Sequence, residues 1–373
     1  GVEVFEKPPL LLWLLRLTGP LFGWSEFGLR LPGVLGAAVA LFYGCRLANQ
    51  GTASPWPGVL AGALTIATVT FTFNARRPMT DPLLCGAVMA SLWYASQLAL
   101  EPGRRAAISL GIAGGLGLLA KWVAMGPAAL VCAVVLARAR RWRSIGVATG
   151  AAVLVAGPWF LAMTVIHGGS FWEIFLGYHV VERAGAALVG AAPLTVYAET
   201  FWSLDGLLGV ALLLGLIAAV VVDRSAVTWL VAGTAVVTLV AVHVASTRLY
   251  HYVMPVVPLL AVGTAIAASR RREALLGLAA LGLVAFVSGP LDPTLLRPDF
   301  APTSKVIGQS LRDAPADATI VLWEDYDPAL TWYVERPVRI WTQSESMAAI
   351  QNSIDMMRRT EAVVFATPER LRA

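Results

Sequence analysis

A carboxylate stands at the start of one of the long apolar runs of this sequence. Asp81 lies in the segment FNARRPMTDPLL, directly before Pro82. A charged group at the mouth of a membrane-spanning helix is costly unless it is paired or functional. Asp81 could cap the helix N-terminus, where Asp and a following Pro are both favoured. It could also be a catalytic carboxylate that orients or deprotonates an attacking hydroxyl or amine.

Basic residues that could bind a phosphate occur in two segments. Arg76 and Arg77 lie just upstream of Asp81, and Lys7 precedes two prolines. Prolines suit the first turn of a helix, so Lys7 is expected at a rigid helix start. Fixed cations bind phosphate well, and a helix N-terminus also favours an anion. The same side chains could instead anchor helices at the membrane interface by snorkelling.

Two further segments carry polar groups. If FWEIFLGYHVVER is helical, His179 and Arg183 lie four residues apart on one face. Glu6 and His179 could share a divalent ion, since carboxylate and imidazole suit zinc. Two ligands are too few to predict a metal site, so no cofactor is predicted and this ion stays a weak alternative. In STRLYHYVMPVVP, a cluster suggests the wall of a buried cavity: Arg248, His251 and Tyr252.

The composition indicates an integral membrane protein. Hydrophobic residues make up 57% of the 373 residues and charged residues 14%, against roughly 25% charge in ordinary soluble domains. The net charge of +5 comes from arginines in short loops between apolar runs. Anionic lipid headgroups are therefore the expected counter-charge, and no nucleic acid partner is predicted. The three cysteines lie inside apolar runs and are expected to be buried small side chains.

About ten spanning helices are predicted, since a span needs roughly 20 apolar residues. The predicted spans are 29–49, 56–74, 81–100, 106–120, 123–138, 145–166, 205–222, 226–246, 252–269 and 273–289. Residues 7–22 are apolar but broken by prolines and Arg16, so an interfacial helix is expected there. Residues 290–373 are charged and contain two strand-like segments, ATIVLW and EAVVFA, and two helix-like segments, SKVIGQSLRDA and MAAIQNSIDMMRR (347–359). They predict a small α/β domain after a transmembrane domain at 1–289.

Successive spans cross the membrane in opposite directions, so the predicted spans assign each loop to one side of the membrane. The basic loops at 104–105, 138–143 and 270–272 fall on one side, which the positive-inside rule makes cytoplasmic. The residues that could do chemistry then fall on the extracytoplasmic face, as does the C-terminal domain. These residues are Lys7, Arg76, Arg77, Asp81, Lys121, His179, Arg183, Arg248, His251 and Tyr252, of which Lys121 is not assigned to the site.

The segments taken together resemble a known family. FEKPPLLLWL, LFGWSEFGLRLPGVL, ARRPMTDPLL, GLGLLAKWVAMGPAALV, GPWFLAMTVIHGGSFWEIFLGYHVVER and RLYHYVMPVVPLLAV follow one another in this order. They are similar to the lipid-to-acceptor sugar transferases of the GT-C superfamily, in the aminoarabinose transferase and protein O-mannosyltransferase group. The resemblance covers nearly the whole chain.

The resemblance implies an inverting transferase in a bacterial inner or plasma membrane. It would move a sugar from a polyprenyl-phosphate carrier to a lipid, protein or glycan. Carried over, Lys7 and Arg183 would neutralise the carrier phosphate, and Asp81 would be an acidic residue of the site. The other pocket residues would be Arg248, Tyr252, His179, His251, Arg76 and Arg77.

The sequence departs from the family pattern at three places. The first span and the acidic loop that precede the EKPP segment in the family are absent, so a truncated chain is expected. Arg248-Leu249-Tyr250 stands where the family has Lys-Leu-Pro, and Lys121-Trp122 replaces a Lys-Gly pair. A non-catalytic homologue and a polytopic lipid or solute transporter therefore remain alternatives.

Overall fold

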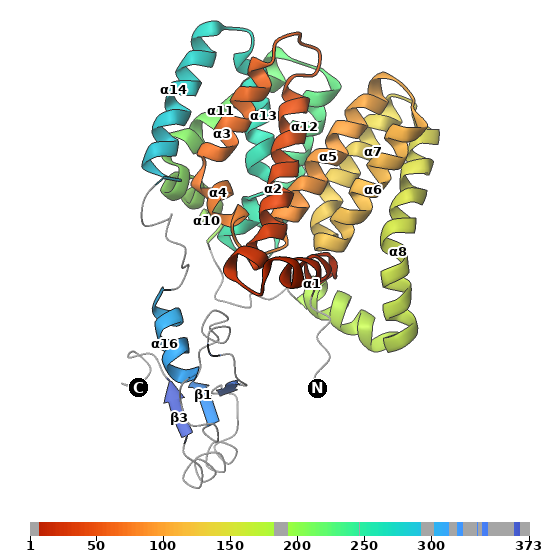
Figure 1. Ribbon diagram of the computed structural model, residues 1–373. Helices are drawn as coiled ribbons and strands as arrows, with labels where there is room; N and C mark the ends of the chain where they lie inside the picture. The colour runs from red at the N-terminus through yellow and green to blue at the C-terminus, as the bar shows by residue number, and fades with distance from the viewer. Residues whose placement is uncertain are drawn as a thin grey trace. The chain divides into compact units, whose positions relative to one another are not determined.

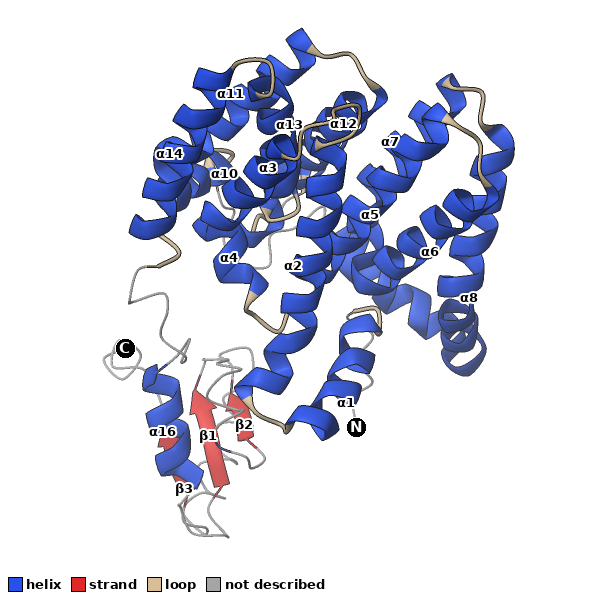
Figure 2. Ribbon diagram, turned by 45° about the horizontal axis from the view of Figure 1, so that its top comes forward, coloured by secondary structure: helices blue, strands red, loops and turns tan. Residues whose placement is uncertain are grey.

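The computed structural model describes residues 7–182, 193–245, 247–291, 302–312, 319–323, 334, 338–341 and 362–365. The chain divides into two compact units, Gly1–Leu295 and Leu296–Ala373. Within the described residues, the larger unit is built from helices, and the strands belong to the smaller unit (Figures 1 and 2). Three expectations fall outside the described residues: Glu6, Arg183 and the predicted helix at 347–359.

The larger unit is a bundle of long apolar helices joined by short loops. The α-helices are α1 (Leu10–Phe22), α2 (Glu26–Ala48), α3 (Trp56–Ala67), α4 (Val69–Ala75), α5 (Asp81–Leu100), α6 (Arg104–Lys121), α7 (Gly126–Arg138), α8 (Trp142–Trp172), α10 (Val196–Thr200), α11 (Gly206–Val222), α12 (Ala226–Val244), α13 (Val256–Ala268) and α14 (Arg272–Ser288). Two 3-10 turns, η1 (Trp122–Met125) and η4 (Tyr250–Val253), and two π-helical segments, η2 (Glu173–Glu182) and η3 (Phe201–Asp205), complete it.

Seven helical runs in the described part of the chain are long and apolar enough to cross a membrane. An eighth is added if α3 and α4, which meet at a 75° bend, count as one span. The protein is therefore an integral membrane protein. Two of the ten predicted spans, 106–120 and 123–138, fall within a single run, Arg104–Arg138. A third, 273–289, corresponds to α14, whose 17 residues cover about 26 Å of a hydrocarbon core roughly 30 Å thick.

The run Arg104–Arg138 consists of two helices that point in opposite directions. Lys121, at the end of α6, donates a hydrogen bond to Asp81, where α5 begins. Arg141, just after α7, donates to the carbonyl of Leu100, where α5 ends. One continuous helix following α6 could not return to the far end of α5. The chain therefore reverses at η1, and α6 and α7 run along α5 in opposite directions.

The two ends of the bundle differ in charge. The Asp81 end holds the starts of α5 and α13 together with η1. The arginine end holds the loops at 101–103, 139–141, 223–225 and 269–271, and one cavity there is lined by both Arg138 and Arg224. The basic loops predicted to share a side therefore do lie at the same end.

Close helix packing at the Asp81 end depends on glycine. A Cβ at Gly36 in α2 would lie 2.7 Å from the Pro82 carbonyl oxygen of α5, and one at Gly86 would lie 2.7 Å from the Gly36 oxygen. The backbones of α2 and α5 can approach this closely only because these side chains are absent. This contact fixes the start of α5, and with it Asp81. Helix α13 packs against α11, α3, α12 and α2, and Val256–Ala265 is buried.

Two predictions about local structure need refinement. The expected interfacial helix at 7–22 corresponds to α1, which has 13 residues and is too short to span. The predicted span at 145–166 is followed by further helix, because the chain bends at Gly168 (φ 59°) and continues as a π-helical segment to Glu182. Figure 1 shows this segment turning beneath the bundle after α8. Cys85 and Cys132 are buried and Cys45 is half-buried, much as expected.

The smaller unit contains a parallel sheet. Its strands β1 (Thr319–Trp323), β2 (Val338–Trp341) and β3 (Ala362–Phe365) lie in the order β2-β1-β3, with Ile320 opposite Val338 and Val363. β1 and β3 fall on the segments predicted as strands, and β2 was not predicted. Helix α16 (Pro302–Arg312) falls on the SKVIGQSLRDA segment.

Candidate active site

An ion pair between two helix ends forms the centre of the candidate site. Lys121 Nζ lies 2.8 Å from Asp81 Oδ1, and the Asp81 side chain is 4% exposed. Because α5 begins and the antiparallel α6 ends at this level, the two side chains meet across the helix contact. Thr80 makes no side-chain capping bond, and Asp81 is the acidic residue of the first turn. Asp81 is thus more than a helix-starting residue, since its carboxylate is held by a lysine from another helix.

Tyr252 of η4 covers the lysine. Lys121 Nζ lies 4.4 Å from the centre of the Tyr252 ring, a cation–π distance. The ammonium is therefore held between a carboxylate and an aromatic face. Tyr252 and Asp81 are far apart in the sequence, and both contact Lys121 in the structure.

His251 connects this pair to further cations. Its electrostatic neighbours are Asp81, Lys121, Arg77 and Lys7. Arg77 Nη1 donates to the Tyr250 hydroxyl over 2.5 Å, which ties the loop after α4 to η4. Residues from four separate segments of the sequence thus converge around one carboxylate.

Arg76 and Arg248 lie at the edges of this group. Burial lowers the pKa of the half-buried Arg76, and the nearby positive charge of Arg30 lowers it further. Arg248 donates from Nε and Nη2 to the His243 carbonyl over 3.1 and 3.0 Å, which satisfies an acceptor at the end of α12. It also interacts electrostatically with Tyr197, as Tyr252 does, so it remains near the ring that covers Lys121.

Three of the predicted site residues lie wholly or partly outside what the structure describes. Arg183 and Glu6 fall outside the described residues. His179 lies in η2, and its side chain is outside what the structure describes. Among the described residues, no group of three or more His, Cys, Asp or Glu side chains could hold a metal ion. The pair Glu6 and His179 therefore remains an untested expectation.

An aromatic cluster that was not predicted as part of the site holds η1 against η2. Trp122 packs on Phe160 and Phe175 with ring centroids 5.5 and 5.3 Å apart. Phe175 stacks in turn on Phe171 at 5.0 Å. The Trp122 that replaces a glycine of the family pattern thus fixes the turn that follows Lys121.

Lys121 and Tyr250 are the site residues that sequence reasoning missed. Both contacts join segments far apart in the chain: 40 residues separate Lys121 from Asp81, and 173 separate Arg77 from Tyr250. A lysine at the end of an apolar run on the same side as Asp81 was the available signal for Lys121.

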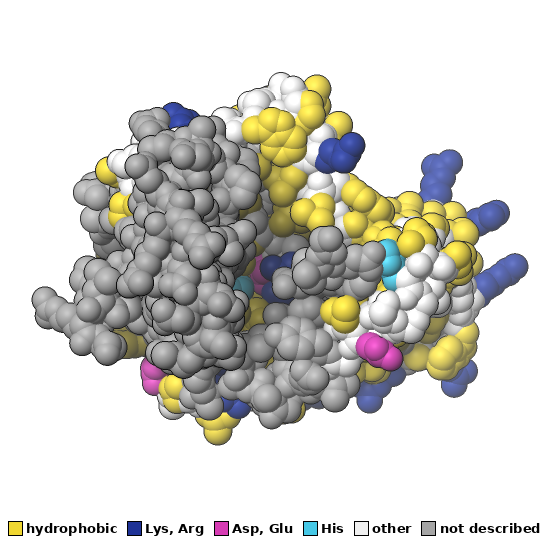
Figure 3. Space-filling model, turned by 90° about the horizontal axis from the view of Figure 1, so that it is seen from below, with side chains coloured by type: hydrophobic (Ala, Val, Ile, Leu, Met, Phe, Trp, Pro, Cys, Tyr) yellow, Lys and Arg dark blue, Asp and Glu magenta, His cyan; other side chains and the backbone are white. Residues whose placement is uncertain are grey.

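The face at the Asp81 end brings opposite charges together. Figure 3 shows acidic, basic and histidine side chains close to one another in a recess of this face. Cations held in a partly buried recess can bind a phosphate through charge-assisted hydrogen bonds. A fixed carboxylate beside them can orient or accept a proton.

Residues 6–161 match the family model described as dolichyl-phosphate-mannose-protein mannosyltransferase. Similar proteins include undecaprenyl phosphate-alpha-4-amino-4-deoxy-L-arabinose arabinosyl transferases. The one from Edwardsiella ictaluri is 28% identical over 193 residues, covering 49% of this chain and 35% of that protein. The one from Pseudomonas aeruginosa (strain UCBPP-PA14) is 29% identical over 196 residues, covering 49% and 35%. The chain thus spans about a third of the length of these curated relatives.

Two solved structures of ArnT from Cupriavidus metallidurans share the fold. The structure bound to undecaprenyl phosphate gives a TM-score of 0.78 at 15% identity, covering 98% of this chain and 80% of that one. The apo structure gives 0.79 at 14% identity, covering 99% and 84%. The family match includes Lys7, Asp81 and Lys121, and the likeness of fold extends over nearly the whole chain. Residues 6–161 are therefore similar to this transferase family, and the chain shares the fold of the two ArnT structures over nearly its whole length.

Proposed function

We propose that this protein transfers a sugar from a polyprenyl-phosphate carrier to an acceptor, with inversion at the anomeric carbon. The observation that carries the proposal is the convergence of Asp81, Lys121, Tyr252, His251 and Arg77 at one end of a membrane bundle. The named substrates of the similar transferases support a lipid-linked donor. The acceptor class, whether lipid, protein or glycan, stays open.

The carrier phosphate is the leaving group, and it gains negative charge as the glycosidic bond breaks. Fixed cations in a water-poor recess stabilise that charge and favour the transition state. Lys7 and Arg77 supply two such cations, and Arg183 is proposed as a third. Tyr252 and Arg248 line the pocket, and His251 lies between the cations and the carboxylate.

Asp81 is proposed to act on the acceptor. Its Oδ1 accepts the hydrogen bond from Lys121, which fixes the plane of the carboxylate. Oδ2 would then accept a hydrogen bond from the acceptor hydroxyl or amine as it attacks. Proton transfer to a positioned side chain contributes roughly 10²–10⁴-fold to a rate.

We also infer how the protein sits in its membrane. Ten crossings follow if α6, α7 and α14 each cross and if the bent pair α3–α4 crosses once. The arginine end would then be cytoplasmic, with the Asp81 end facing outward from a bacterial inner membrane. Since α14 runs away from the arginine end, the residues after it would form a small α/β domain on the outer side.

A sugar-transfer assay with the protein in proteoliposomes tests the proposal. Undecaprenyl-phosphate-linked pentoses and hexoses are offered as donors with a panel of lipid, glycan and peptide acceptors. Asp81→Asn should reduce transfer by about 10²–10⁴-fold while the protein still binds undecaprenyl phosphate. Lys7→Ala should weaken that binding.

Asp223→Asn, which changes a carboxylate at the opposite end, is the matched control and should keep normal turnover. Normal turnover in Asp81→Asn and Lys7→Ala would exclude this site. Binding of undecaprenyl phosphate without transfer to any acceptor would favour the non-catalytic homologue.

A further inference from the structure

A cavity at the arginine end is separate from the candidate site. It lies between α7 and α12 and has a volume of about 530 Å³. Pockets for small ligands usually measure about 300–1,000 Å³. Apart from two arginines, the residues that line it are apolar or small, and they include Leu130, Val134 and Trp229.

The cavity has the length of one leaflet. Along α7 it extends from Leu130 to Arg138, which is about 12 Å at 1.5 Å per residue. Along α12 it extends from Ala226 to Val237, which is about 17 Å. The hydrocarbon core is roughly 30 Å thick, so the slot reaches about halfway through it from the arginine end.

Gly233 keeps the slot open. It lies on the α12 wall, and a Cβ at this position would lie 3.1 Å from Val131 Cγ1 of α7. A larger side chain at this position would occupy the space between the two helices. The absence of a side chain at Gly233 therefore contributes to the spacing of α7 and α12 at the slot.

Two arginines stand at the mouth of the slot. Arg138 ends α7 and Arg224 precedes α12, and both line the cavity and are exposed. Among the described residues, neither forms an ion pair, whereas Arg141 donates to the Leu100 carbonyl and Arg270 pairs with Asp223 at 3.6 Å.

Asp223, the carboxylate next to Arg224, is already engaged. It accepts hydrogen bonds from the hydroxyls of Ser225, over 2.6 Å, and Thr228. The mouth of the slot therefore presents two cations without an acidic partner in the described structure. A negatively charged headgroup would complement them.

We propose that this slot binds one anionic glycerophospholipid of the leaflet at the arginine end. An acyl chain lies between α7 and α12, and the phosphate lies between Arg138 and Arg224. Trp229, which is 48% exposed, contacts the chain near the headgroup, where aromatic side chains favour the membrane interface. The site is independent of the transferase proposal, because none of these residues belongs to the group around Asp81.

The experiment measures lipid retention by native mass spectrometry and thermal stability in nanodiscs. Phosphatidylglycerol is compared with phosphatidylcholine of the same acyl chains. The full chain should retain phosphatidylglycerol preferentially and unfold at a higher temperature with it. The double variant Arg138→Gln/Arg224→Gln should lose about tenfold or more of that preference, because each basic residue near a lipid surface contributes about 1 kcal/mol.

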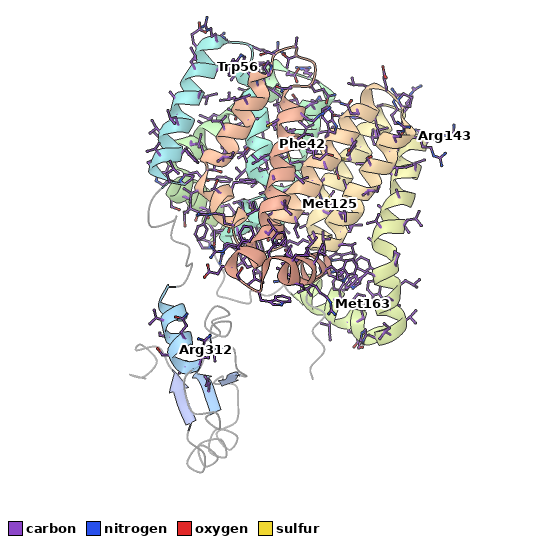
Figure 4. The ribbon with its side chains drawn as sticks, viewed as in Figure 1. Phe42, Trp56, Met125, Arg143, Met163 and Arg312 are labelled. Atoms are coloured by element: carbon purple, nitrogen blue, oxygen red, sulfur yellow. The ribbon has the colours of Figure 1, made fainter. Side chains whose placement is uncertain are left out.

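Matched variants separate this site from general surface charge. Figure 4 shows Arg143 on the outer side of α8 at the same end of the bundle, so Arg143→Gln should keep the preference. Gly233→Leu places a side chain in the slot and leaves both arginines in place. It should lower the amount of phosphatidylglycerol that the protein retains. Gly277→Leu in α14, where a Cβ would meet nothing within 4 Å, is the control.

Three outcomes would overturn the proposal. The first is equal retention of the two lipids by the unmodified chain. The second is unchanged lipid retention in Gly233→Leu together with an unchanged preference for phosphatidylglycerol in the double arginine variant. The third is stabilisation by inorganic phosphate to the same extent as by phosphatidylglycerol, which would make the arginines a site for free phosphate.

Discussion

At the scale of single residues, the candidate site depends on one lysine with two partners. Lys121 interacts with the carboxylate of Asp81 and with the ring of Tyr252, so it joins three segments of the chain. Removing the lysine leaves a carboxylate that is 4% exposed without its partner. Such a group is expensive to leave uncompensated, because burial strips it of water.

Lys121→Met should therefore destabilise the protein. We expect a loss of about 2 kcal/mol, below the roughly 3–5 kcal/mol of a fully buried pair, because the lysine side chain is 29% exposed. Chemical unfolding in detergent micelles measures it. Adding Asp81→Asn should recover part of the loss, and strictly additive effects of the two changes would show that the ion pair does not couple them.

A second residue, Asp223, makes the stability of the folded protein depend on pH. Burial raises the pKa of Asp223, but hydrogen bonds from Ser225 and Thr228 and the charge of Arg270 outweigh it, so the pKa falls below its ordinary 3.8. A carboxyl group whose pKa is lower in the folded state stabilises that state above the unfolded pKa. The stability is lost as the pH falls through the folded pKa.

Unfolding measured from pH 6 down to pH 2.5 should therefore show a smaller acid loss in Asp223→Asn than in the unmodified chain. The variant should be less stable at pH 6 and should approach the unmodified chain at the acid end. Parallel curves over the whole range would contradict the shift.

At the scale of elements, two broken helices are joined at one buried carboxylate. Asp205 precedes Gly206 (φ 53°), where the π-helical η3 gives way to α11. Its Oδ1 accepts from the Thr70 backbone N–H at 3.1 Å, and its Oδ2 accepts from the Thr70 hydroxyl at 2.6 Å. These groups lie in the first turn of α4, just after its 75° bend from α3. The Asp205 carboxylate thus supplies an acceptor for a backbone N–H that has no intrahelical partner at the start of α4.

Asp205→Ala should cost more stability than Asp205→Asn. The alanine leaves the buried Thr70 donors unpaired, at about 1–3 kcal/mol for each, whereas asparagine keeps one acceptor oxygen. Chemical unfolding of the two Asp205 variants, each alone and combined with Thr70→Val, measures the coupling free energy between Asp205 and Thr70. Equal losses in the alanine and asparagine variants would mean that the contact does not hold the two breaks together.

Much of the element pattern could be predicted from hydropathy, and the breaks could not. Apolar runs predicted α2, α5, α11 and α12 to within a few residues, because a helix in lipid must satisfy its own backbone polar groups. The bend at Thr68 is held by Asp205, a partner from another segment, which one sequence does not reveal. Lys121 escaped the predicted site for the same reason, since its partners lie 40 and 131 positions away.

At the scale of the whole molecule, the difference in charge between the two ends gives the bundle an orientation. The arginine end carries Arg104 and Arg138 at helix ends and Arg224 in a loop, and the Asp81 end carries the candidate site. Because positive loops remain in the cytoplasm, a lipid-linked donor would meet the site on the outer side. The proposed phospholipid slot and the proposed transfer site would then belong to opposite leaflets.

Cysteine labelling tests this orientation in intact cells. Arg140→Cys and Pro78→Cys place thiols on exposed loops at the two ends, in a background where the three native cysteines are replaced by alanine. A thiol reagent that cannot cross the membrane should label the cysteine at position 78 in intact cells, and the one at position 140 only after permeabilisation. The reverse pattern would put Asp81 in the cytoplasm, and a polyprenyl-linked donor flipped to the outer leaflet could then not reach it.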